Sequence, residues 1–172
     1  MSAEQKKIII ALTKRVEALE AAQLAVTAAA RRSEANLDVD KYWVLNGLAK
    51  SKLKGGEIVY AGSVVIPTGE QYLWQRHGGV NDLFKKDWAS LDGVIGALGH
   101  PVRLRLLKSI LEGQHTKAEL ERLDGIGTTG QLYHHLKSLE EGGWVRSLQR
   151  GTYGVPGERV VPLLAILTAA LG

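Results

Sequence analysis

The chain has 172 residues, of which 45% are hydrophobic and 23% are charged, and it contains no cysteine. This composition excludes a wholly disordered chain, and the missing thiols exclude disulfides, thiolate metal sites and cysteine nucleophiles. The 22 basic and 18 acidic residues leave a net charge of +4, which permits nucleic-acid binding without requiring it. The longest apolar run, 160–171, is about half of the ~20 residues that cross a bilayer. With no signal-peptide pattern after residues 1–7, we expect a cytoplasmic protein with no membrane partner.

Residues 1–37 are predicted to form one long helix. Ser2 and Gln5 have the spacing of a capping box, and Ala, Glu, Lys and Leu dominate the residues that follow. A heptad phase places apolar residues at seven of nine core positions. The a positions are Ile9, Val16, Gln23, Ala30 and Leu37, and the d positions are Leu12, Leu19, Val26 and Ser33. The pattern favours a coiled coil over the alternative, an amphipathic helix packed on its own domain.

Residues 38–80 are predicted to form a second module, which combines a short helix with a β-hairpin. Asp40 is expected to cap the helix, which ends near Ala49. Apolar residues then alternate over 58–66 and indicate a strand, and the run 71–75 indicates the returning strand.

Two features of this hairpin lead to further expectations. Gly62 is interpreted as a β-bulge, because the first strand looks longer than the second. Both faces of the hairpin are apolar, so another element must cover it; a helix is favoured over a ligand in a pocket.

A third domain is expected over 81–172, and it is helical almost to its end. Its first helix begins at Asn81 or Asp82 and runs through Leu98. Pro101 suits the first turn of the next helix.

Two short capped helices joined by a tight glycine turn follow, and this pattern is typical of a helix-turn-helix. Thr116 with Glu119 and Thr128 with Gln131 have the spacing of capping boxes. The segment 124–127 is the glycine-rich turn between the two helices.

The second of these helices has one apolar face. Leu132, Leu136 and Leu139 lie on it at i, i+4 and i+7, which predicts that they are buried. His135 lies beside this stripe and is interpreted as a half-buried structural residue. The opposite and flanking positions carry Gly130, Gln131, Tyr133, His134, Lys137, Ser138 and Glu141.

A small hairpin is predicted after this helix. The segments 144–149 and 152–155 are extended and flank a turn at Gly151, which is the pattern of a wing. The closing helix over 160–171 is apolar all round, so we expect it to be buried in a subunit interface.

Two segments of this C-terminal half resemble the winged helix-turn-helix transcriptional regulators of the ArsR type. They are 98–107, with the sequence LGHPVRLRLL, and 132–145, with the sequence LYHHLKSLEEGGWV. The resemblance implies a homodimer whose second helix enters the major groove of DNA and whose wings touch the flanking backbone. The wing here is shorter than in that family. The cysteines of the metal-sensing members are absent, and no His, Asp or Glu replaces them in 160–171. The resemblance therefore implies DNA binding but not metal sensing.

The residues expected to contact double-stranded DNA lie in the second helix and the wing. Gln131 can pair with adenine through two hydrogen bonds, and Lys137 suits a phosphate or guanine. Thr128 and Thr129 are expected near phosphates at the helix N-terminus. The full set is Thr128, Thr129, Gly130, Gln131, Tyr133, His134, Lys137, Arg146, Gln149 and Arg150.

Catalytic, cofactor and metal sites are not predicted. The segment 125–130 matches the dinucleotide motif GxGxxG, but a helix and not a strand precedes it, so we expect no nucleotide site. His134 and His135 point about 100° apart on a helix and cannot bind one ion together. No serine-nucleophile elbow and no phosphate-binding loop occurs, so we do not expect an enzyme.

The expected architecture is mainly α with small β: a winged helix-turn-helix domain preceded by a β-hairpin module and a long N-terminal helix. We expect a dimeric, sequence-specific DNA-binding regulator in the cytoplasm, associated with the nucleoid. The homodimer would form through the N-terminal and C-terminal helices. The alternative is a helix-turn-helix domain that serves protein assembly without reading DNA. The sequence identifies no effector.

Overall fold

The computed structural model describes residues 3–34 and 42–172, with side chains for 4–24 and from 42 onward. The chain divides into two compact units, Met1–Lys52 and Leu53–Gly172. The predicted caps Ser2 and Asp40 lie outside the described residues, as does the predicted helix break around residues 36–40.

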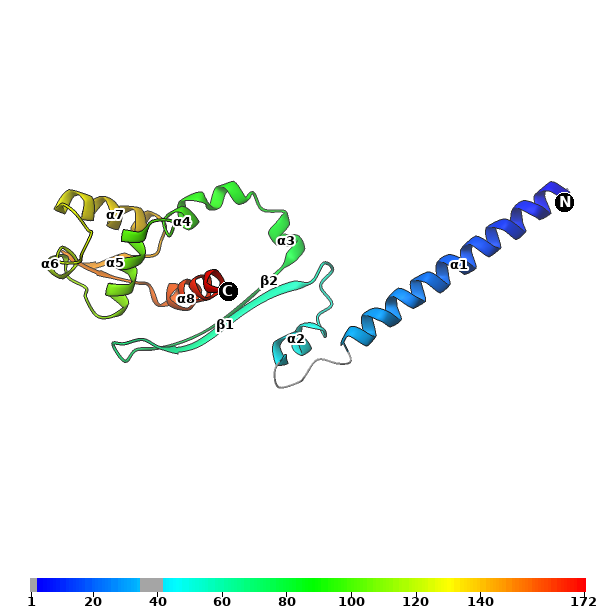
Figure 1. Ribbon diagram of the computed structural model, residues 1–172, viewed down its shortest axis with the longest axis horizontal. Coiled ribbons are helices and arrows are strands. Elements are labelled where there is room, and N and C mark those ends of the chain that lie inside the picture. Colours follow the sequence, from blue (N-terminus) through cyan, green and yellow to red (C-terminus); the bar gives the residue numbers. More distant parts are fainter. Residues whose placement is uncertain (1–2, 35–41) are drawn as a thin grey trace. The chain divides into compact units, whose positions relative to one another are not determined.

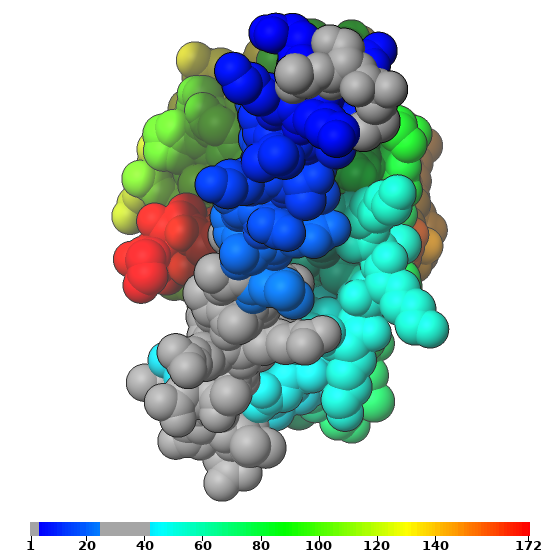
Figure 2. All heavy atoms as spheres, turned by 90° about the vertical axis from the view of Figure 1, so that its right-hand side faces the viewer, coloured from blue at the N-terminus to red at the C-terminus, as the bar shows by residue number. Residues whose placement is uncertain are grey.

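The first unit contains two helices. Helix α1 spans Ala3–Glu34, so the prediction of one long N-terminal helix is confirmed over that range. Helix α2 spans Trp43–Leu48, and its N-cap residue Tyr42 provides no side-chain capping bond. Every side chain described on α1 is exposed, and Figure 2 shows one side of this part of the helix in blue. No helix among the described residues is long and apolar enough to cross a membrane.

The second unit begins with a β-hairpin and continues with helices and a second, smaller hairpin (Figure 1). Its elements are β1 (Glu57–Val65), β2 (Gln71–Gly79), α3 (Val80–Phe84), η1 (Trp88–Leu91), α4 (Asp92–Gly96), α5 (Pro101–Leu111), α6 (Lys117–Leu120), α7 (Thr129–Glu141), β3 (Arg146–Gln149), β4 (Thr152–Gly154) and α8 (Gly157–Leu171). This order is mostly helical and is consistent with a winged helix-turn-helix that carries an additional hairpin.

Strands β1 and β2 pair antiparallel over nine residues each, without a shift in register. The predicted bulge at Gly62 is therefore wrong: Gly62 pairs directly with Trp74. Its role is to allow a close approach, because a Cβ at this position would lie 2.6 Å from Cγ1 of Val161 in α8. Glycine thus lets α8 pack against the middle of β1.

Helix α8 covers one face of the hairpin, so the expectation of a covering helix is confirmed within the same chain (Figure 1). Val160 and Val161 are buried, whereas Val65 and Leu73 on the opposite face of the hairpin are 68% and 70% exposed. Because α8 joins the hairpin to the C-terminal helices, the predicted domain boundary after residue 80 does not coincide with a boundary between the two units.

A cavity of about 290 Å³ also opens beside this contact. Its walls come from the end of β1, from α5 and from α8, and they are mostly aliphatic. The helix and a pocket are therefore both present at the hairpin.

The core of the second unit lies among α5, α6, α7 and α8. Its fully buried side chains are Leu106, Leu107, Ile110, Leu120, Leu132, Leu136, Leu139, Trp144, Val160 and Leu163. Trp144 satisfies its indole by donating a hydrogen bond to the Val94 carbonyl oxygen at 2.7 Å. Helix α5 begins as predicted, with Pro101 in its first turn and with His100 as its cap.

The single helix expected from residue 81 or 82 through Leu98 is wrong, because the structure has the three short helices α3, η1 and α4 there. Asp87 interrupts the helix with an extended backbone at φ −74° and ψ 108°. Its carboxylate accepts a hydrogen bond from the Ala89 N–H at 3.0 Å, which caps a new helix start. Helix α8 also differs slightly from expectation, since it begins at Gly157 and includes Pro162.

Candidate nucleic-acid interface

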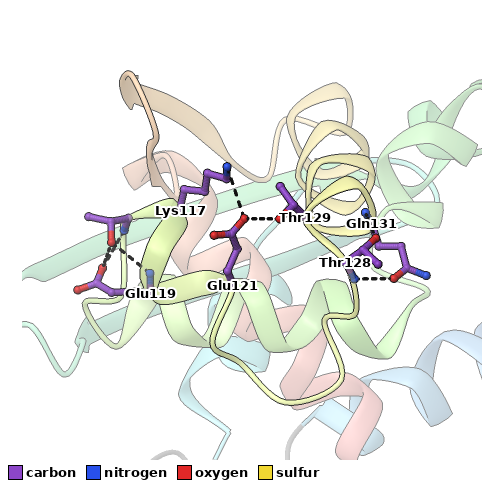
Figure 3. Close-up of polar contacts among 7 residues, drawn as sticks. Lys117, Glu119, Glu121, Thr128, Thr129 and Gln131 are labelled. Carbon is purple, nitrogen blue, oxygen red and sulfur yellow. Dashed lines mark hydrogen bonds and ion pairs between the residues drawn. The ribbon is translucent and has the colours of Figure 1, made fainter.

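Helices α6 and α7 form the predicted helix-turn-helix, and both capping boxes are present. Thr116 Oγ1 accepts a hydrogen bond from the Glu119 N–H, and Glu119 Oε2 accepts one from the Thr116 N–H at 2.8 Å. The Thr116 N–H and the Thr116 hydroxyl, which also donates to Glu119 Oε2 at 2.7 Å, lower the pKa of the Glu119 carboxyl, because these bonds stabilise its charged form. Thr128 Oγ1 and Gln131 Oε1 accept the equivalent pair of bonds at the start of α7 (Figure 3).

The glycines of the intervening turn give the backbone conformations that the turn requires. Gly125 and Gly127 have positive φ values of 76° and 82°, which side chains other than glycine rarely adopt. Arg105 holds the turn by donating a hydrogen bond to the Asp124 carbonyl oxygen at 2.6 Å. The loop between α6 and α7 follows no strand, so it lacks the setting of a dinucleotide site.

Helix α7 buries one face and exposes the other, as its periodicity predicted. Leu132, Leu136 and Leu139 are at most 1% exposed. The residues expected to contact DNA at the start and along the outer face of the helix are all exposed: Thr128, Thr129, Gly130, Gln131, Tyr133, His134 and Lys137. The structure therefore brings these side chains together on one open surface, here called the α7 surface.

Gln131 is on this surface, but its amide is partly occupied. Oε1 accepts a hydrogen bond from the Thr128 N–H at 2.8 Å. A bidentate pair with adenine needs both the amide oxygen and the amide nitrogen. In such a pair Oε1 would have to accept a second hydrogen bond beside that from Thr128, whereas Nε2 can donate to an acceptor on DNA and leave the capping box unchanged.

The structure adds two residues that the sequence-based prediction missed, Lys117 and Glu121 of the helix-turn-helix. Glu121 Oε1 accepts a hydrogen bond from the Thr129 hydroxyl at 2.8 Å and lies 3.5 Å from Lys117 Nζ (Figure 3). Lys117 Nζ also lies 5.0 Å from the centre of the Tyr133 ring. The contact with Tyr133 raises the pKa of the Lys117 ammonium. In the sequence, the i, i+4 spacing of Lys117 and Glu121 was the available signal for these two residues, but that spacing indicates only an ion pair.

The predicted wing is present as strands β3 and β4. Arg146 pairs with Gly154 at its base, and the register shifts between Ser147 and Gln149. Arg146, Gln149 and Arg150 are exposed, as a set of DNA contacts would have to be.

The wing tip lies against the start of α6. The Lys117 N–H donates to the Gly151 carbonyl oxygen at 2.8 Å, and the Tyr153 N–H donates to the His115 carbonyl oxygen at 2.9 Å. Since Lys117 also contacts Tyr133, this lysine connects the wing tip with the α7 surface. Burial raises the pKa of Tyr72 in β2, and the charge of Arg146, at the base of the wing, acts in the opposite direction.

The described residues contain no group of three or more His, Asp or Glu side chains that could hold a metal ion. His135 is half-buried as predicted, and its ring packs on His100 with centroids 4.6 Å apart. Burial lowers the pKa of His135, and the nearby charges of His100 and Arg103 act in the same direction. His134 lies on the exposed side of the helix.

Comparison with known proteins yields one solved structure that resembles this chain. It is the crystal structure of an ArsR family transcriptional regulator, 26% identical, and the match covers 50% of this chain and 91% of that chain with a TM-score of 0.39. A TM-score of 0.39 does not by itself establish a shared fold, so the proposal below rests on the geometry of this chain. No protein-family model and no curated protein matches the chain.

Proposed function

We propose that the protein is a sequence-specific transcriptional regulator that binds double-stranded DNA through α7 and the β3–β4 wing. The observation that carries this proposal is the α7 surface, an exposed polar face on a capped helix of a helix-turn-helix. Its opposite face is anchored in the core by Leu132, Leu136 and Leu139. A helix held in this way can enter the major groove as a rigid unit.

Within this proposal the residues have separate roles. Tyr133, His134 and Lys137 face the bases, and Gln131 contributes its free amide nitrogen. Thr128 and Thr129 lie near phosphates at the helix N-terminus.

The wing supplies contacts that position the protein but do not read sequence. Gln149 and Arg150 at the tip contact the flanking backbone, and Arg146 contributes from the base. Lys117 is added to this group because it lies between the wing tip and Tyr133.

The proposal further includes a homodimer, no metal requirement, no catalytic activity, and a cytoplasmic location with the nucleoid. A two-fold symmetric protein would bind two half-sites, one α7 in each. The apolar surface of α8 supports an interface with a second copy less strongly than the sequence suggested, because the β1–β2 hairpin of the same chain already covers part of that surface. The exposed residues of α1 therefore carry that part of the proposal.

The test is selection of bound fragments from a random pool of duplex DNA. Enrichment of an inverted repeat would support the proposal and give the half-site spacing. A triple alanine variant at Gln131, Tyr133 and His134 serves as the control for α7. Equal affinity of wild type and a folded triple variant for the selected site would rule out DNA reading by this helix.

The alternative of a protein-assembly module has one observation in its favour. The uncovered face of the hairpin exposes Val65 and Leu73, which suits contact with another protein. Binding to duplex DNA at two salt concentrations separates the two functions, because phosphate contacts impose a steep salt dependence. Affinity that is negligible at both concentrations would favour assembly.

A further inference from the structure

Helix α1 presents a row of large apolar side chains that its own unit does not cover. Ile9, Leu12, Val16 and Leu19 are between 50% and 64% exposed. They are spaced alternately three and four residues apart, so they lie along one side of the helix as a seam. A helix of 32 residues with such a seam needs a partner, because tertiary packing and not local propensity supplies most helix stability.

The residue types along the seam specify the kind of partner. The a positions Ile9 and Val16 are β-branched, and the d positions Leu12 and Leu19 are leucines. This combination favours two parallel strands, whereas isoleucine at both positions, or leucine at a with isoleucine at d, shifts the preference to three or four.

The charges that flank the seam agree with the same arrangement. Arg15 occupies a g position and Glu20 the following e position. In a parallel, in-register pair, each g residue meets the e residue five positions later in the other strand, so Arg15 of each copy faces Glu20 of the other. An antiparallel pair with the same four core layers would instead place Arg15 against Arg15, although it would bring Lys6 near Glu20.

We propose that α1 forms a parallel, in-register, two-stranded coiled coil with α1 of a second copy of this chain. Four layers from Ile9 to Leu19 form its core, and two symmetric Arg15–Glu20 pairs set its orientation. The inference deepens the proposed dimer. A parallel coil has the C-terminal ends of both helices at the same end, so both chains continue toward their DNA-binding units from that end. The inference does not depend on DNA being the ligand.

Cysteine cross-linking tests the orientation directly, because the natural chain has no cysteine to compete. In the full-length Val16→Cys variant, the two thiols share one core layer, and mild oxidation should convert most of the protein to a disulfide-linked dimer. Lys14→Cys is the matched control: it lies at an f position, away from the partner, and should stay unlinked. A link that forms only when Leu12→Cys and Val16→Cys chains are mixed would indicate antiparallel strands and overturn the proposal.

Charge reversal provides an independent measurement by sedimentation equilibrium of the full chain. Arg15→Glu and Glu20→Arg should each weaken dimerisation by about tenfold, since attraction becomes repulsion at both pairs. The double variant should restore the wild-type dissociation constant, because the pairs are re-formed with exchanged signs. A double variant weaker than both single variants, a monomeric wild type at tens of micromolar, or a trimeric mass would each overturn the proposal.

These variants also keep the two proposals separate. Arg15, Val16 and Glu20 lie outside the DNA-binding unit. If the α7 triple variant loses DNA binding while Val16→Cys still cross-links, the result supports DNA binding by α7 and leaves the coiled coil unaffected. If Val16→Cys does not cross-link in a protein that still binds its DNA site, the coiled-coil proposal is overturned and the proposed DNA binding is not.

Discussion

At the scale of single residues, Gln131 combines two roles that its sequence position did not separate. Its amide oxygen closes a capping box with the Thr128 N–H, and its amide nitrogen points away from Thr128 (Figure 3). Measuring DNA affinity together with stability separates a role of Gln131 in DNA binding from its role in capping.

We predict that Gln131→Ala lowers affinity for the preferred DNA site by roughly 0.5–1.5 kcal/mol, the contribution of a single hydrogen bond, and relaxes its sequence preference through loss of the outward donor. Gln131→Glu is the matched variant, since a carboxylate preserves the cap but cannot donate to a base. Both affinities come from fluorescence anisotropy, and thermal melting reports the cap. If Gln131→Glu binds DNA as tightly as wild type, the side chain does not contact DNA.

His135 gives the second prediction at this scale, which concerns pH. Burial, with nearby His100 and Arg103, lowers the pKa of His135 in the folded state below that in the unfolded chain. Between these two pKa values, the unfolded state therefore binds more protons than the folded state. The contribution of His135 to the free energy of unfolding should be fully present above about pH 6.5, the usual histidine pKa. It should be lost as the pH decreases toward the folded-state pKa.

Chemical denaturation between pH 8 and pH 5 measures this dependence. A His135→Phe variant preserves a ring against His100 and should show a shallower decrease over this range than wild type. Lys137→Ala, on the exposed side of α7, is the control and should retain the wild-type slope, because a lysine side chain does not titrate between about pH 5 and pH 8. Equal slopes for wild type and His135→Phe would show that His135 does not cause the decrease.

At the scale of elements, the close packing of α8 on β1 depends on the absence of a side chain at Gly62. A Cβ there would lie 2.6 Å from Val161, closer than packed atoms tolerate. The wing and α6 form the second important contact between elements, through the bond from the Lys117 N–H to the Gly151 carbonyl oxygen.

We predict that Gly62→Ala lowers the free energy of unfolding by about 1–3 kcal/mol, because it overpacks the contact between β1 and α8. Gly78→Ala is the control in the opposite strand, since a Cβ there would meet nothing within 4 Å. Urea denaturation measures both. Adding Val161→Ala to Gly62→Ala should cost less than the sum of the single changes, and simple additivity would show that the two sites are not coupled.

The wing leads to a prediction of a different kind. Arg150→Ala should weaken binding to all DNA sequences alike and reduce the salt slope by about one unit, because a phosphate contact carries no sequence information. The slope comes from titrations at several salt concentrations with specific and random duplexes. A loss confined to the specific duplex would instead assign a base contact to Arg150.

At the scale of the whole molecule, the chain separates an exposed helix from a folded unit that contains the candidate DNA-binding surface. The division falls after Lys52, so α1 belongs to a unit of its own with α2. If the proposals hold, changes in α1 should affect dimerisation and changes in α7 should affect DNA binding, each without the other.

We predict that deleting residues 1–37 weakens dimerisation without unfolding the second unit, because none of its core residues lies in the deleted segment. Light scattering gives the mass, and the retained melting transition reports the core. Binding to the selected inverted repeat should weaken more than binding to a single half-site. An unchanged dimer mass after deletion would move the interface to α8 or the hairpin.

The sequence by itself determined the features that depend on residues close together along the chain. The two capping boxes, the buried leucines of α7 and its exposed opposite face follow from spacings of three and four residues. The hairpins follow equally from alternation and turn residues. The break at Asp87 was missed although it is local, because the apolar pattern continues across it.

Only the tertiary structure decided the features that join distant segments. Gly62 and Val161 are almost a hundred positions apart, so sequence alone suggested a bulge where the fold has a close packing contact. Likewise, the wing tip, Lys117 and Tyr133 meet through α6, and local patterns do not encode that meeting. The physical reason is that periodicity specifies which face of an element is apolar, whereas the packing of all elements together selects the partner for that face.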